Sequence, residues 1–155
     1  MSDETTNDTP EGEESEVEVT PIDLDGDGKA DGVTITSVAT ADSSGDGQDD
    51  TVAEVSMTVI DVDGDGQADI VETTETVGID VDGDGTIDII QETVTTAIDV
   101  DGDGVPDIID QTVTTAADTD GDGTFETVEQ VSATAVVGPD GEVEELEITE
   151  TSTEG

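Results

Sequence analysis

The stretch DVDGDGQADIVETTETVGI, residues 61–79, contains both features that decide the fold of this chain. Its first nine residues are acidic and rich in glycine, and its last ten are rich in valine, isoleucine and threonine. The acidic segment recurs every 19 residues, beginning at Asp23, Asp42, Asp61, Asp80, Asp99 and Asp118. A fixed period of this kind is the signature of a repeat architecture.

The ten-residue segments predict β-strands. They read IVETTETVGI at 70–79, IIQETVTTAI at 89–98 and IIDQTVTTAA at 108–117. β-Branched residues favour an extended chain over a helix, and no apolar stripe with a helical period is present. Ten extended residues span about 33 Å, so a long strand is expected between successive acidic segments.

Two all-β architectures fit this period. In an antiparallel meander each unit contributes one strand, and the acidic segments form the turns at alternate ends of the sheet. In a β-solenoid each unit is a full coil, which requires a second turn inside the ten-residue segment. Those segments contain Gly32 and Gly78 but no proline or asparagine, so the usual residues of a second turn are scarce. The sequence therefore predicts a repetitive antiparallel meander, with a solenoid of one 19-residue coil per unit as the alternative.

Apolar residues recur at two fixed positions of the strands. The eleventh residue of every unit is aliphatic, as at Val71 and Ile90, and the nineteenth is apolar, as at Ile79 and Ile98. The two positions have the same parity, so within a strand their side chains point to the same side. We therefore expect one face that is apolar near both rows of turns, with mostly threonine, serine, glutamate or valine between them.

The two ends of the chain depart from the repeat. Residues 1–15 are acidic and rich in serine, threonine, glycine and proline, which predicts a disordered tail. A lead-in strand and the six repeats occupy residues 16–136. In the last unit, residues 137–155, the acidic segment has become VGPDGEVEE, which predicts a tight turn followed by a capping strand.

The composition excludes several functions. The 155 residues include 45 acidic residues and a single basic one, Lys29, which gives a formal net charge of −44. Nucleic acid and anionic membranes would be repelled, and no run of about 20 apolar residues is present for membrane insertion. The 1% aromatic content provides no stacking platform and little material for a pocket, so we expect no enzymatic activity.

Five of the six acidic segments place carboxylates at positions 1, 3, 5 and 9 around two glycines, and the second has Ser44 at position 3. In the third segment the backbone carbonyl of Gln67 offers a further oxygen, and Gly66 permits a sharp turn. Oxygen ligands on a flexible loop suit Ca²⁺ best. Four carboxylates about 5 Å apart repel one another by roughly 5 kcal/mol even in a water-like dielectric, and a cation removes that penalty. A plain Asp-Gly turn does not need so many acids.

The sequence therefore predicts up to six Ca²⁺ sites, with a metal-free cap at residues 137–155. The predicted ligands are Asp23, Asp25, Asp27 and Asp31; Asp42, Ser44, Asp46 and Asp50; Asp61, Asp63, Asp65 and Asp69; Asp80, Asp82, Asp84 and Asp88; Asp99, Asp101, Asp103 and Asp107; and Asp118, Asp120, Asp122 and Glu126. In the solenoid alternative the same ions would stabilise the coils.

The pattern D-x-D-G-D-G-x-x-D followed by an aliphatic strand, as in DVDGDGQADIV at 61–71, resembles the calcium loops of FG-GAP and VCBS-type repeats. Less closely, Asp61–Glu72 and Asp118–Glu129 resemble EF-hand loops, which carry an acid at position 12. The EF-hand likeness stops at the flanks, which are strands here. The resemblance to both families implies Ca²⁺ as the ligand. It implies no shared fold, because a 19-residue unit is too short for a propeller blade.

These observations predict a non-enzymatic calcium-binding tandem-repeat protein that folds on binding Ca²⁺ and serves as a structural, surface or adhesive spacer. The alternatives are a soluble calcium buffer or sensor and a disordered acidic solvating chain. A sensor exposes a methionine-rich groove, and this chain has only Met1 and Met57. Millimolar extracellular Ca²⁺ favours an extracellular or cell-surface location, although no N-terminal signal peptide is visible. Self-association or a surface or matrix partner is expected.

Overall fold

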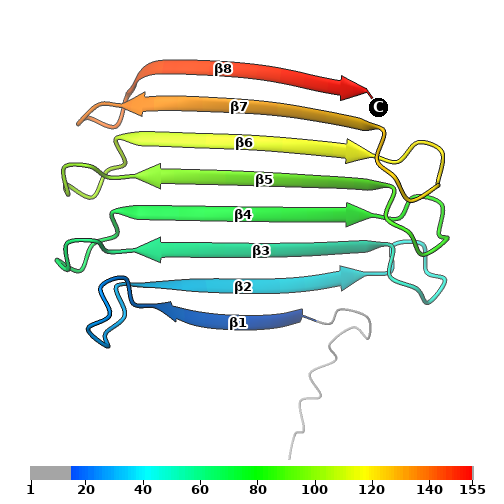
Figure 1. Cartoon of the computed structure of the whole chain (residues 1–155), viewed down its shortest axis with the longest axis horizontal. Coiled ribbons are helices and arrows are strands. Elements are labelled where there is room, and N and C mark those ends of the chain that lie inside the picture. The colour runs from blue at the N-terminus through cyan, green and yellow to red at the C-terminus, as the bar shows by residue number, and fades with distance from the viewer. Residues whose placement is uncertain (1–14, 155) are drawn as a thin grey trace, which may run out of the picture.

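The computed structural model describes residues 15–154, which form eight β-strands in one open antiparallel sheet (Figure 1). The strands are β1 (Ser15–Ile22), β2 (Gly32–Ala41), β3 (Thr51–Ile60), β4 (Ile70–Ile79), β5 (Ile89–Ile98), β6 (Ile108–Ala117), β7 (Thr127–Val137) and β8 (Val143–Glu154). They lie in the sheet in chain order. Residues 1–14, most of the predicted disordered tail, lie outside the described residues.

The prediction of an all-β antiparallel meander is confirmed, and the chain does not form the alternative solenoid. The connections alternate between the two ends of the sheet (Figure 1). The first, third and fifth loops and the last turn share one end, at residues 23–31, 61–69, 99–107 and 138–142. The second, fourth and sixth loops share the other, at residues 42–50, 80–88 and 118–126. Successive loops at one end are two strands apart, so they follow one another at about 9.6 Å.

The strand register corrects the expected distribution of apolar residues. Each neighbouring pair from β2 to β7 is matched over ten residues, and residues directly opposite one another point to the same face. The eleventh residue of one unit therefore lies beside the eighteenth of the next, as Val33 lies beside Val59. The expectation that the eleventh and nineteenth positions build one apolar face is wrong, because these positions change face from one strand to the next.

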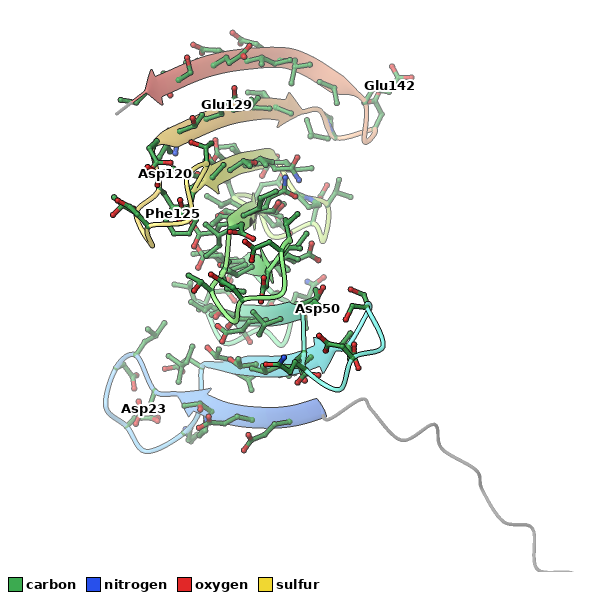
Figure 2. All side chains as sticks on the ribbon, turned by 90° about the vertical axis from the view of Figure 1, so that its right-hand side faces the viewer. Asp23, Asp50, Asp120, Phe125, Glu129 and Glu142 are labelled. Atoms are coloured by element: carbon green, nitrogen blue, oxygen red, sulfur yellow. The ribbon has the colours of Figure 1, made fainter. Side chains whose placement is uncertain are left out.

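Neither face of the sheet is covered by another element of the described chain (Figure 2). Within residues 16–153 no hydrophobic side chain is buried. The buried polar residues are aspartates at loop ends, each only 6% or 7% exposed: Asp50, Asp80, Asp99 and Asp118. The usual distribution of residues is inverted, because a single layer leaves aliphatic side chains half-exposed while the loops at each end lie against one another.

Backbone ladders and cross-strand side-chain pairs hold the strands together. The hydroxyls of Thr34 and Thr58 lie 2.9 Å apart across β2 and β3, and the Thr134 hydroxyl donates to Asp110 Oδ2 at 2.6 Å across β6 and β7. Such pairs contribute roughly 0.2–1 kcal/mol each.

The described residues contain no helix long and apolar enough to cross a membrane.

Candidate metal centres

Each of the six loops is closed at its base by a backbone hydrogen bond. The N–H of the ninth residue donates to the carbonyl of the residue before the loop, as Asp69 donates to Ile60 at 2.8 Å. Inside the third loop, Gly64 and Gly66 have φ values of 78° and 91°, in the left-handed region that glycine adopts without steric cost. These two bends direct the backbone N–H groups of the loop toward its centre.

The carboxylate at position 1 accepts two of those N–H groups. In the fourth loop, Asp80 Oδ1 accepts from Gly83 N at 2.7 Å, and Asp80 Oδ2 accepts from Gly85 N at 2.7 Å. The equivalent pair of bonds is present in all six loops, at 2.6–2.9 Å. Position 1 is therefore the residue around which the loop folds.

At positions 3, 5 and 9, one carboxylate oxygen of each side chain accepts a hydrogen bond from a backbone N–H of the loop. Asp82 Oδ1 accepts from Asp84 N at 3.1 Å, and Asp84 Oδ1 accepts from Thr86 N at 2.8 Å. Asp88 Oδ2 accepts from Val81 N at 2.6 Å. A carboxylate has about four acceptor sites, so in the fourth loop the second oxygen of each of these three groups is available to an ion. The four predicted ligands of the fifth loop make the corresponding bonds.

The predicted ligands converge to different extents in different loops. In the sixth loop, whose Asp120 is labelled in Figure 2, all four acids offer ligand atoms within 4.8 Å of one another: Asp118, Asp120, Asp122 and Glu126. Four other loops bring together three acids each: Asp23, Asp25 and Asp27; Asp42, Asp46 and Asp50; Asp61, Asp63 and Asp69; and Asp80, Asp82 and Asp88. Asp31, Asp65 and Asp84 stand outside these groups. In the second loop all three predicted acids converge.

Neighbouring loops at one end are joined by a backbone hydrogen bond. The first residue of a loop donates its N–H to the carbonyl of the ninth residue two units earlier, as Asp99 donates to Asp69 at 2.9 Å. The same bond joins the other buried first-position acids, Asp80 and Asp118, to the loops before them. A buried carboxylate is costly unless its charge is balanced. Among the described residues the one ion pair is that of Lys29 with Asp27 at 3.0 Å.

Hydrogen bonds within the loops favour the ionised form of several carboxyls. The N–H of Gly47 is the main cause that lowers the pKa of Asp42, and the Ser43 hydroxyl is the main cause that lowers the pKa of Asp50. At Asp118, burial opposes ionisation, but the N–H groups of its loop together outweigh burial and lower the pKa. These three side chains are therefore anionic at neutral pH.

The EF-hand likeness does not extend to the twelfth residue in the third loop. Glu72 lies on β4, where its Oε2 accepts from Thr96 Oγ1 on β5 at 3.5 Å. It is not a member of the group formed by the aspartates of its loop. Any ion in this loop would be held by the nine residues of the loop itself.

Two kinds of contact are not evident from the repeated motif. In the second loop, Ser43 Oγ donates to Asp50 Oδ2 at 2.9 Å. In the third loop, Gln67 Nε2 donates to Asp65 Oδ2 at 3.1 Å and to the Gly102 carbonyl of the fifth loop at 3.5 Å. The only sequence signal for the contact between loops is the meander itself, which returns every second loop to the same end.

No protein-family model matches the chain, and no curated protein or solved structure matches it. The structure itself contains repeated strands and several acidic groups able to hold metal ions.

Proposed function

We propose that this chain is a non-enzymatic calcium-binding tandem-repeat protein that takes up to six Ca²⁺ ions. The observation that carries the proposal is the burial of Asp50, Asp80, Asp99 and Asp118 at the loop ends of a chain with a net charge of −44. Buried carboxylates are normally paired with a cation or coordinate one. Lys29 serves one loop only, so bound ions are the remaining source of positive charge.

Electrostatic repulsion gives the size of the effect. Ligand oxygens that lie within 4.8 Å of one another repel at roughly 0.8 kcal/mol per pair in a water-like dielectric, or about 5 kcal/mol for four carboxylates. Hydrogen bonds from backbone N–H groups reduce this repulsion but leave the net charge unchanged. A divalent ion at the centre of the loop replaces the repulsion with attraction, so ion binding and closure of the loops are coupled.

The donor set favours Ca²⁺ over other common ions. The chain has no histidine or cysteine, which Zn²⁺ prefers, so every side-chain ligand is an oxygen. Mg²⁺ demands near-octahedral geometry and gives up its water reluctantly, whereas Ca²⁺ accepts about six to eight oxygens in irregular arrangements. A glycine-bent loop with carboxylates, backbone carbonyls and open access to water fits the second description.

The role we propose for the ion-bound sheet is that of a structural, surface or adhesive spacer outside the cell. Strands of ten residues between two rows of loops make an extended element, and millimolar extracellular Ca²⁺ would fill loops of modest affinity. A sensor would need an apolar groove that opens on binding. Within the described residues Met57 is the only methionine, and it lies on an uncovered strand face.

Calorimetry and circular dichroism with matched ions test the proposal. Chelator-treated protein is titrated with Ca²⁺ and, separately, with Mg²⁺ at the same concentrations and ionic strength. We expect Ca²⁺ to bind at up to six sites and to increase the β-sheet signal, while Mg²⁺ binds weakly and folds the chain poorly. Equal folding by the two ions would show that screening of charge is sufficient and that the loops are not specific sites.

A further inference from the structure

The two faces of the sheet differ in character. Residues opposite one another in paired strands share a face, so the odd-numbered residues of β1–β7 lie on one face and the even-numbered residues on the other. We call the odd-numbered face the aliphatic face. It includes the β8 residues that pair with odd-numbered residues of β7. Its most exposed hydrophobic residues include Val17, Val19, Val55, Met57, Leu146 and Ile148. Figure 2 shows the side chains on both faces uncovered.

The charged strand residues lie mainly on the opposite face. The even-numbered face carries Glu16, Glu18, Glu54, Glu72, Glu92 and Asp110. On the aliphatic face, by contrast, the part formed by β1, β2 and β3 carries no charged residue. This part is called the β1–β3 patch, and Ser37 lies at its centre between Val17 and Val55.

We propose that the β1–β3 patch is the interface of a face-to-face dimer, occupied by the same patch of a second copy. In a chain with a net charge of −44, an uncharged patch across three strands is where two copies approach with least repulsion. A two-fold axis parallel to the strands, above β2, places β1 of one copy over β3 of the other. The two Ser37 side chains then face each other, and Glu75 on β4 lies outside the overlap.

The area of the patch is sufficient for a weak dimer. Three strands about 4.8 Å apart and about 33 Å long present roughly 500 Å², so two patches bury about 1,000 Å² in total, the lower limit for specific interfaces. Packing two aliphatic sheet faces together is the ordinary arrangement of a β-sandwich. The inference concerns the sheet alone and is independent of which ion occupies the loops.

The two edges of the sheet are poorer sites for association. The outer strand β1 carries Glu16 and Glu18, and the outer strand β8 carries Glu145 and Glu147. Pairing of these strands between copies would place like charges beside one another along the new ladder, which is destabilising. Association through the aliphatic face avoids this repulsion, so the face is favoured over the edge.

A matched pair of lysine substitutions on one strand tests the proposal. Val55 and Val52 both lie on β3 and are 37% and 36% exposed, but Val55 is on the aliphatic face and Val52 is on the other. Sedimentation is measured in millimolar Ca²⁺, or in whichever ion gives the folded sheet, up to millimolar protein. We expect the unaltered chain to dimerise, Val55→Lys to weaken the dimer about tenfold or more, and Val52→Lys to leave it unchanged.

Two cysteine variants provide a test that does not disturb the patch. The chain has no cysteine, and Ser37 and Ser56 lie near the middle of neighbouring strands on opposite faces. We expect a short bifunctional thiol reagent to cross-link Ser37→Cys into dimers and to leave Ser56→Cys monomeric. Monomer at every concentration would overturn the proposal, as would equal cross-linking of both variants. Association that neither lysine variant weakens would also overturn it, since it would indicate pairing at the edges.

Discussion

The fourth loop and the turn at residues 138–142 both join antiparallel strands, but they do so with different chemistry. The turn is closed by bonds from Gly138 N to Glu142 O and from Gly141 N to Gly138 O, both at 2.9 Å. Gly141 supplies its one positive φ, of 77°. Its single aspartate, Asp140, accepts from Glu142 N through Oδ1 at 3.2 Å. The fourth loop uses nine residues and four aspartates for the same connection.

The difference shows that five residues with one left-handed glycine and two acids are sufficient to reverse the chain in this sheet. The turn even keeps the contact between neighbouring connections, because the Val137 N–H donates to the Asp107 carbonyl of the fifth loop at 2.8 Å. The register is disturbed only locally, by an irregularity between Val136 and Val137. The additional length and charge of the six loops are therefore not needed for chain reversal, which supports the proposed ion binding.

The largest expected effect is the loss of the whole sheet when Ca²⁺ is removed. Repulsion at six loops acts on both ends of β2–β6, and no buried hydrophobic side chain within residues 16–153 opposes it. The β7–β8 hairpin should also unfold, although its connection carries two acids where the fourth loop carries four, because an isolated hairpin is only marginally stable in water. Far-UV circular dichroism and the hydrodynamic radius in chelator measure the effect. Chelator already saturated with Ca²⁺ is the control, and an unchanged spectrum and radius on removing the ion would contradict the prediction.

A reciprocal exchange of connections sharpens the comparison. Replacing residues 80–88 with the turn sequence GPDGE keeps Ile79 opposite Ile89, as Val137 is opposite Val143 in the native turn. Replacing residues 138–142 with DVDGDGTID makes the opposite change. If the sites belong to the loops, calorimetry should count about one ion fewer in the first variant and about one more in the second, because each loop holds one ion. Identical counts in both variants would show that the loops do not carry independent sites.

Much of this architecture follows from sequence, because each strand and each loop is a local feature. The periodic β-branched segments predict strands such as β4 and β5, and the spacing of aspartates and glycines predicts the loops between them. The distribution of apolar residues between the faces does not follow, because it depends on which residue of β3 lies opposite Val33. The burial of Asp80 and Asp99 also depends on contacts between loops two units apart, which no single repeat contains.

A smaller effect is expected from changing one aspartate to asparagine in each connection. In Asp80→Asn the amide nitrogen can no longer accept an N–H, so the bond from Gly83 or Gly85 is lost together with the charge. Leaving a buried donor unsatisfied costs about 1–3 kcal/mol. Asp140→Asn is the control, because one amide oxygen is sufficient for its single bond to Glu142 N.

The measurements are denaturant unfolding in saturating Ca²⁺ and the calorimetric site count. Asp80→Asn should lower the unfolding midpoint and weaken one site, while Asp140→Asn changes neither. Equal destabilisation by the two substitutions would mean that the first loop position has no special role in the folded loop.

The smallest expected effect separates the second loop from the other five. Ser44 stands where the others have an aspartate, and its Oγ donates to Asp42 Oδ1 at 3.3 Å. The acids of this loop that converge are therefore Asp42, Asp46 and Asp50. One carboxylate fewer among the predicted ligands should weaken attraction for a divalent ion by about 1 kcal/mol at partly screened distances. Calorimetry should then show five sites filling before one weaker site, and Ser44→Asp should raise the weak site to the affinity of the rest.

Ser43→Asp is the control, because it adds the same charge at a position whose hydroxyl contacts Asp50 at 2.9 Å, so it should not strengthen the site. Six equivalent sites in the unaltered chain, or equal gains from both substitutions, would mean that total charge sets the affinity and that the third loop position is not a direct ligand.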